Sequence, residues 1–215
     1  MLTKAPLAPL AIGGVLMVMV YAGGHVSGAH YNPAVTLAVL LRGRITAADA
    51  ATYVVAQFVG GAVGALIARW VVDPDKVTAL SLSGRQLGAA LLVEVLFTFA
   101  LAYVVLNVAT SSSHPDNSFY GLAIGFTVLA GAIAVGGISG GAFNPAVAVG
   151  GSIAGLFSWS SLRIYLLSQV VGSVLAAVAF LALNPHERGV QGAESGAEPD
   201  AAPGAETPAS HLASP

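Results

Sequence analysis

The hydrophobic residues of this chain form long blocks that charged residues rarely interrupt. A helix needs about 20 mainly apolar residues to cross a membrane. Four blocks reach that length, at residues 51–72, 87–109, 119–138 and 164–183, and a fifth block at residues 6–23 is slightly shorter. The pattern therefore predicts an all-α membrane protein with five full transmembrane spans.

Two further apolar stretches, residues 33–41 and 145–157, are too short to cross a membrane. Each opens with Asn-Pro and follows a glycine-rich run. Asparagine is a preferred N-cap, and proline fits the first helical turn because no hydrogen bond is lost there. Half-length helices with such starts are typical of discontinuous helices that line a cavity inside a membrane.

The sequence repeats itself at an offset of 112 residues. Residues 27–35 match residues 139–147, and downstream Tyr53, Gln57 and Gly60 match Tyr165, Gln169 and Gly172. Three spans separate the two copies, an odd number, so the copies enter the membrane from opposite sides. The N-termini of the two half-helices then meet near the midplane, where non-helical backbone lines a water-filled cavity or is buried in protein.

The repeat places two Asn-Pro-Ala triplets at this meeting point: Asn32, Pro33, Ala34, Asn144, Pro145 and Ala146. A helix N-terminus carries the equivalent of about half a positive charge, so two facing ends disfavour a cation but not a neutral molecule. The asparagine oxygens would cap the half-helices and leave the NH₂ groups free to donate to a passing solute. The alternative is that both asparagines are ordinary caps that face protein.

Composition supports a membrane protein and excludes several other classes. Apolar residues make up 56% of the chain and charged residues 8%, far below the roughly 25% of soluble domains. The chain has no cysteine, which excludes a disulfide scaffold and a cysteine-ligated metal site. No nucleic-acid-binding pattern, cofactor motif, nucleophile elbow or acid–base pair is present. We therefore predict neither an enzyme nor a bound cofactor or metal.

The two ends of the chain need separate interpretations. Lys4 and the apolar block after it also fit a cleaved signal peptide, but residues 12–21 match a later segment of the repeat. Residues 185–215 are rich in Ala, Pro, Gly and Glu and predict a disordered tail behind a membrane domain at residues 1–184. Lysine and arginine counts in the loops almost balance, and the acidic tail favours the cytoplasmic side. We expect an integral protein of the cell (plasma) membrane, in contact with lipid.

Two polar residues outside the triplets are candidates for supporting the loops. Glu94 is an acid well inside a span, where a carboxylate is costly unless it is paired. His30 lies two positions before Asn32, and we expect it to form hydrogen bonds within the loop. His25 and His30 have no acidic partner nearby in the sequence and do not indicate a metal site.

Paired Asn-Pro-Ala motifs on an inverted repeat resemble the aquaporin or major intrinsic protein family, over residues 6 to about 184. The resemblance implies a homotetramer with one pore per subunit, and a Glu94 carboxylate that accepts hydrogen bonds from the backbone at residues 140–143. It also implies a selectivity filter, located by spacing from the motifs, that consists of Ile12, Ala132, Gly141 and Val147.

This filter departs from the pattern of the family. Most water channels of the family have Arg at the position of Val147 and often His at the position of Ala132. The glycerol-facilitator branch usually has Arg-Asp where this chain has Val147 and Ala148. Valine at this position resembles some plant vacuolar members. We expect a wide, apolar filter without a fixed positive charge.

A second departure concerns the number of spans. Each repeat of the family has three spans, and the match of residues 87–109 at the same offset would lie before Met1. We expect that the first helix is missing, either because the start codon is placed too late or because the sequence is a fragment.

Three functions remain open at the level of sequence. The first is a passive channel for water and small neutral solutes such as glycerol, urea, ammonia or dissolved gas. The second is a secondary transporter, which inverted repeats also build but which would need charged groups for ion coupling at the midplane. The third is a truncated membrane protein that does not conduct.

Overall fold

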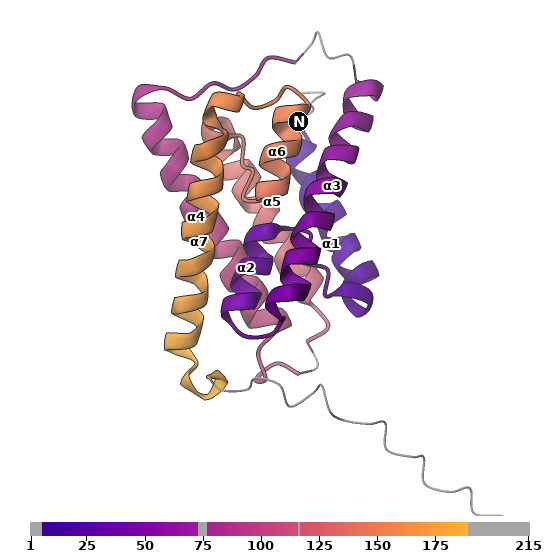
Figure 1. Ribbon diagram of the computed structural model, residues 1–215, viewed down its shortest axis with the longest axis vertical. Coiled ribbons are helices and arrows are strands. Elements are labelled where there is room, and N and C mark those ends of the chain that lie inside the picture. Colours follow the sequence, from indigo (N-terminus) through magenta and orange to yellow (C-terminus); the bar gives the residue numbers. More distant parts are fainter. Residues whose placement is uncertain (1–5, 73–76, 116, 189–215) are drawn as a thin grey trace, which may run out of the picture.

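The computed structural model describes residues 6–72, 77–115 and 117–188, which are helical apart from loops and one isolated β-bridge between Leu80 and Phe157 (Figure 1). Within these residues, five helices are long and apolar enough to cross a membrane. They are α1 (Ala8–Ser27), α3 (Ala47–Val71), α4 (Gly84–Ala109), α5 (Tyr120–Ser139) and α7 (Leu162–Leu183). Two shorter helices, α2 (Pro33–Leu41) and α6 (Pro145–Ile153), and two 3-10 turns, η2 (Trp159–Ser161) and η3 (Pro185–Glu187), complete the described part.

The all-helical fold predicted from the hydrophobic pattern is confirmed, with shifts at the helix ends. Helix α3 begins earlier than predicted because Thr46 caps it, its hydroxyl accepting a hydrogen bond from the Asp49 amide at 3.1 Å. Helix α6 ends at Ile153 rather than at residue 157. Gly155 adopts a positive φ of 79°, and the following amide of Leu156 turns back to the Gly151 carbonyl at 2.7 Å.

The tail differs from its prediction in its first residues. Pro185–Glu187 form an ordered turn, and the Glu187 side chain is buried. The remainder of the predicted tail, residues 189–215, lies outside the described residues.

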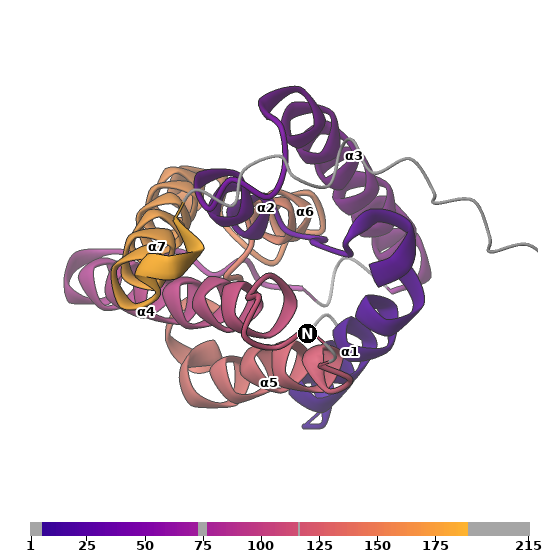
Figure 2. The same ribbon diagram turned by 90° about the horizontal axis from the view of Figure 1, so that it is seen from below.

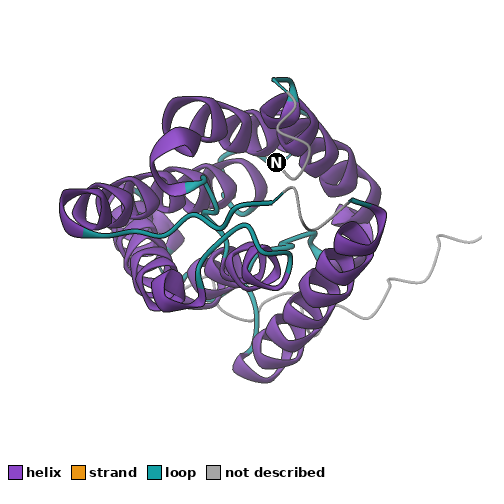
Figure 3. Ribbon diagram, turned by 90° about the horizontal axis from the view of Figure 1, so that it is seen from above, coloured by secondary structure: helices purple, strands orange, loops and turns teal. Residues whose placement is uncertain are grey.

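The two half-helices enter the helix bundle from opposite ends (Figure 1). Viewed along the long axis, the helices form a ring in which α2 and α6 lie between α7 and α3 (Figure 2). The view from the other end shows loop segments that cross the interior of the ring (Figure 3). This is the arrangement that the inverted repeat predicts.

Helices α1 and α5 pack through a matched pair of glycines. A Cβ atom on Gly13 would stand 2.6 Å from the Gly125 carbonyl oxygen, and a Cβ atom on Gly125 would stand 2.6 Å from the Gly13 carbonyl oxygen. Gly13 and Gly125 occupy the same position of the repeat. The two halves therefore meet here in a symmetric contact between equivalent glycines, and neither position has room for a side chain.

Candidate functional site

The loops that lead into α2 and α6 have the same unusual backbone. At three matched positions both loops adopt positive φ angles, which L-residues other than glycine rarely do. The pairs are Gly28 (77°) with Gly140 (84°), Ala29 (49°) with Gly141 (64°), and Tyr31 (48°) with Phe143 (48°). A left-handed conformation at a residue with a side chain costs about 1–2 kcal/mol. Such strain is retained where surrounding contacts fix the backbone.

The two Asn-Pro-Ala triplets meet, and each asparagine contacts the opposite loop. The Asn32 NH₂ group donates to the Phe143 carbonyl at 2.9 Å, and the Asn144 NH₂ group donates to the Tyr31 carbonyl at 2.9 Å. The left-handed residues before the asparagines are thus the acceptors of these bonds. The N-termini of α2 and α6 consequently face each other.

Each asparagine also caps its own half-helix. The Asn32 oxygen accepts from the Ala34 amide and the Asn144 oxygen from the Ala146 amide, both at 2.9 Å. Pro33 and Pro145 occupy the first turn and are buried. The expectation that both NH₂ groups are entirely free is wrong, because one hydrogen of each is bound to the opposite loop. An amide NH₂ has two hydrogens, so one remains on each asparagine for a further acceptor.

Glu94 on α4 is fully buried, and its carboxylate accepts four hydrogen bonds, two of them from the loop before α6. One carboxylate oxygen accepts from the Ser139 hydroxyl at 2.7 Å and the Ala142 amide at 2.9 Å. The other accepts from the Phe143 amide at 2.8 Å and the Gln169 side chain at 2.9 Å. The bonds from Ala142 and Phe143 are those that the family resemblance implied for this carboxylate.

The loop before α2 is supported by neutral groups instead. The His30 ring Nδ1 lies 3.1 Å from the Thr36 hydroxyl, and the His30 amide donates to the Tyr53 hydroxyl at 3.1 Å. Gln57, which matches Gln169 in the repeat, donates to the Thr36 hydroxyl at 2.9 Å. His30 therefore forms hydrogen bonds within the loop region, as its place in the sequence suggested.

The matched tyrosines are functional candidates to which sequence reasoning gave no role. The Tyr165 hydroxyl donates to the Ser139 carbonyl at 2.6 Å, and the Tyr53 hydroxyl donates to the Ser27 hydroxyl at 2.9 Å. Both thus fix the end of the helix that precedes a half-helix. The recurrence of tyrosine at one position of both repeats was the signal that could have identified them.

A cavity of about 1310 Å³ runs past the meeting point of the half-helices. Both Asn32 and Asn144 line it, with apolar side chains from α1, α4 and α5 that include Leu101, Val105, Ile124 and Val128. Of the residues that line the cavity in the described part of the chain, Arg44 is the one with a permanent charge. Such a surface suits uncharged molecules better than ions.

Three of the four residues predicted to form a filter line this cavity, namely Ile12, Gly141 and Val147. The Val147 side chain is 44% exposed, directly after the second triplet. Ala132 is buried and does not belong to the cavity lining. It lies beside Gly141, where an added Cβ would stand 3.5 Å from the Ala132 Cα.

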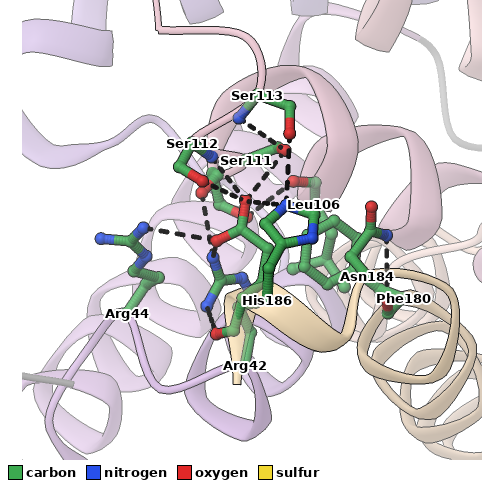
Figure 4. Close-up of polar contacts among 11 residues, drawn as sticks. Arg42, Arg44, Leu106, Ser111, Ser112, Ser113, Phe180, Asn184 and His186 are labelled. Atoms are coloured by element: carbon green, nitrogen blue, oxygen red, sulfur yellow. Dashed lines mark hydrogen bonds and ion pairs between the residues drawn. The ribbon is translucent and has the colours of Figure 1, made fainter. Parts of the chain in front are cut away.

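The structure also brings together a polar group that sequence reasoning missed. We call it the Glu187 cluster, and it consists of Arg42, Arg44, Ser111, Ser112 and Glu187 (Figure 4). Its centre is a buried ion pair with 2.5 Å between Arg42 Nη2 and Glu187 Oε2. Composition alone placed Glu187 in the tail, and no spacing in the sequence links it to Arg42. Among the described residues, no group of three or more His, Asp or Glu side chains could hold a metal ion.

Comparison with known proteins places the chain in a family. Residues 3–180 match the model of the family described as "Major intrinsic protein". The chain is 42% identical over 179 residues to "Glycerol uptake facilitator protein-like 6" of Lactiplantibacillus plantarum, covering 78% of this chain and 80% of that protein.

Two further relatives carry the name aquaporin. "Probable aquaporin AqpM" of Archaeoglobus fulgidus is 36% identical over 178 residues, covering 78% of this chain and 72% of that protein. "Probable aquaporin TIP4-1" of rice (Oryza sativa subsp. japonica) is 36% identical over 183 residues, covering 83% and 72%. These matches show that the chain belongs to the major intrinsic protein family and is a passive membrane channel for water and small neutral solutes, not an enzyme.

Proposed function

We propose that solutes cross the membrane between Asn32 and Asn144. Each asparagine donates a hydrogen bond to the solute from its remaining NH₂ hydrogen. The observation that carries this proposal is the pair of reciprocal bonds from Asn32 to the Phe143 carbonyl and from Asn144 to the Tyr31 carbonyl. These bonds fix both amides at the wall of the cavity that the two residues line. A neutral oxygen-bearing solute finds a donor on each side.

Cation exclusion follows from the helices behind these asparagines. The N-termini of α2 and α6 each present a partial positive charge to the centre of the cavity. A cation at this point loses water and meets repulsion from both ends, whereas a neutral molecule loses only part of its hydration. The same site therefore separates glycerol or water from a potassium ion without a charged side chain.

For selectivity among neutral solutes, we propose a filter lined by Ile12, Gly141 and Val147, with Ala132 packed beside Gly141. Gly141 adds no side chain, Ala132 adds one methyl group, and Val147 has neither charge nor hydrogen-bond donor. Such an opening is wider and less polar than one that contains arginine. Width dominates, because a wide opening lets a solute keep part of its hydration shell. The proposed substrates are therefore water together with glycerol, urea, ammonia or dissolved gas.

We also propose a homotetramer in the cell membrane, with the end that carries Arg42, Arg44 and Arg188 on the cytoplasmic side. Support for the tetramer is the family resemblance. Support for the orientation is the acidic composition of residues 189–215, which continue the chain from that end. The mass of the detergent-solubilised protein tests the first, and protease access to the C-terminus in sealed vesicles tests the second.

The filter is tested by stopped-flow measurement of water and glycerol flux into proteoliposomes. We expect Val147→Arg to lower the glycerol-to-water flux ratio by a factor of about three or more, because it narrows the opening and adds donors. Val147→Leu is the matched control, since it adds bulk without charge and should lower the ratio less. An unchanged ratio in Val147→Arg would show that these four residues are not the constriction.

A further inference from the structure

The Glu187 cluster ties together three segments that are far apart in the sequence (Figure 4). One carboxylate oxygen of Glu187, just after α7, accepts from the Ser111 hydroxyl at 3.0 Å and from the Ser112 amide and hydroxyl at 2.6 and 2.8 Å. The other oxygen accepts from Arg42, the C-cap residue of α2. The carboxylate thus links the end of α7, the loop between α4 and α5, and the first half-helix.

Arg42 strengthens the same junction by further contacts. It donates to the Thr110 carbonyl at 3.2 Å and to the Glu187 carbonyl at 3.3 Å. Its guanidinium carbon lies 5.0 Å from the centre of the Phe180 ring, within the range of a cation–π contact. Both members of the ion pair therefore have further contacts besides each other. The pair is buried, with 1% of the Arg42 side chain and 0% of the Glu187 side chain exposed.

The cluster stands directly behind the wall of the cavity. Arg44, Thr110, Ser111 and Ser112 line the cavity at this end, which we call the α2 mouth. Glu187 binds Ser111 and Ser112 but is not part of the lining, and Arg44 Nη2 lies 3.8 Å from Glu187 Oε2. The carboxylate therefore holds the lining residues from the side away from the lumen.

The repeat does not account for this arrangement. At the offset of 112 residues, Arg42 matches Ala154, which is the C-cap of α6 and has no charge. The ion pair thus belongs to one end of the channel and is not a consequence of the inverted architecture. A buried charge pair is costly to form and strongly destabilising to break, so its presence at one mouth needs a local explanation.

Glu187 remains charged under ordinary conditions. Burial alone would raise its pKa, but the hydrogen bonds from Ser112 and Ser111 and the charge of Arg42 lower the pKa of Glu187 to about 2. The negative charge of Glu187 is consequently constant across the physiological range of pH.

We infer that Glu187 is a positioning residue for permeation, which keeps the α2 mouth open by holding Ser111, Ser112 and Arg44 against the wall. The inference rests on the channel function of the chain and adds a residue outside the predicted site. Without the carboxylate, the loop of Ser111 and Ser112 loses three hydrogen bonds, and Arg44 loses its counter-charge. Both are then able to move into the lumen, where they obstruct a large solute more than water.

Loop mobility tests this inference without any measurement of flux. The chain has no cysteine, so a spin label on His114→Cys reports on the loop alone. His114 is exposed and lines the α2 mouth. We expect an immobile label in the otherwise unchanged chain and a clearly more mobile label with Glu187→Ala. A label on Ser160→Cys, exposed within η2, is the matched control and should not respond to Glu187→Ala.

Solute selectivity provides the second readout. In proteoliposomes, Glu187→Ala should lower the glycerol-to-water flux ratio by a factor of about two or more, because obstruction affects the larger solute first. Glu187→Gln keeps the shape of the side chain and should have a smaller effect. This variant still tests the inference if Glu187→Ala does not fold. Equal label mobility with and without Glu187, or an equal loss of water and glycerol flux, would overturn the inference. Absence of all flux in the unchanged chain would instead contradict the channel itself, and the spin label would still decide the role of Glu187.

Discussion

Each half of the molecule presents the same left-handed loop and Asn-capped helix to the pore. Each half is also supported by a buried carboxylate, but the two carboxylates bind at different places. In the second half, Glu94 binds the loop before α6, at the N-terminal end of that half-helix. In the first half, neutral groups around His30 support that loop, and Glu187 instead binds at the outer end of α2. Similar backbone geometry is thus maintained by contacts at opposite ends of a half-helix.

The two halves also differ in how closely their long helices are packed against neighbours. Gly172 on α7 packs against α4, and an added Cβ there would stand 2.6 Å from the Val95 carbonyl oxygen. Its repeat match on α3, Gly60, has nothing within 4 Å of an added Cβ, and the same holds for Gly64. Matched positions of the two repeats therefore have similar backbone structure but can differ in how far they are buried.

The largest expected effect comes from removing the central carboxylate. Glu94→Ala leaves four donors without their acceptor at a fully buried position, and we expect a loss of about 3–5 kcal/mol in the free energy of unfolding. Chemical unfolding of the detergent-solubilised protein, followed by circular dichroism, measures the loss.

A comparison variant in the other half is Gln57→Ala. Gln57 makes one hydrogen bond, to Thr36, so its removal should cost about 1 kcal/mol. Equal losses for Glu94→Ala and Gln57→Ala would show that the carboxylate has no special role in holding the second loop.

An intermediate effect is expected from the glycines of the two long helices. Gly172→Ala forces the backbones of α7 and α4 apart and should cost about 1–3 kcal/mol. Gly60→Ala at the matched position meets open space and should be neutral or stabilising by up to about 1 kcal/mol, because alanine favours the helix. Thermal unfolding of both variants in the same detergent gives the comparison, and a destabilising Gly60→Ala would contradict the open face of α3.

A smaller effect is expected from acid at the α2 mouth. The pKa of Glu187 is lowered from its ordinary 4.5 to about 2, so its contribution to stability is complete above pH 4.5. This contribution is lost as the pH falls from about 4.5 to about 2, because the unfolded chain takes up the proton first. The midpoint temperature of thermal unfolding should therefore fall more steeply with decreasing pH for the unchanged chain than for Glu187→Gln. Parallel curves would show that Glu187 titrates normally.

Much of the fold could be predicted because local rules determine it. The bounds of α2 agree with the prediction, since Asn32 caps the helix and Pro33 fits its first turn. The cap by Asn144 could be predicted on the same grounds. The end of α6 could not, because it depends on the positive φ of Gly155 and the turn after it.

The tertiary contacts of the site were less predictable. The bonds between Asn32 and Phe143 and between Asn144 and Tyr31 connect residues more than a hundred positions apart, and nothing local specifies them. The pairing of Arg42 with Glu187 is a similar case, because the composition around Glu187 is that of a solvated tail. For Glu94, by contrast, the family resemblance indicated the contacts that the structure contains.

The central claim is that two facing, Asn-capped helix ends admit neutral solutes and exclude cations. The most direct test measures glycerol flux and potassium current for the same protein in proteoliposomes and planar bilayers. We predict glycerol flux without potassium current for the unchanged chain, and a potassium current for Asn144→Asp, which adds a negative charge at the centre. A potassium current in the unchanged chain as large as that of Asn144→Asp would contradict the claim.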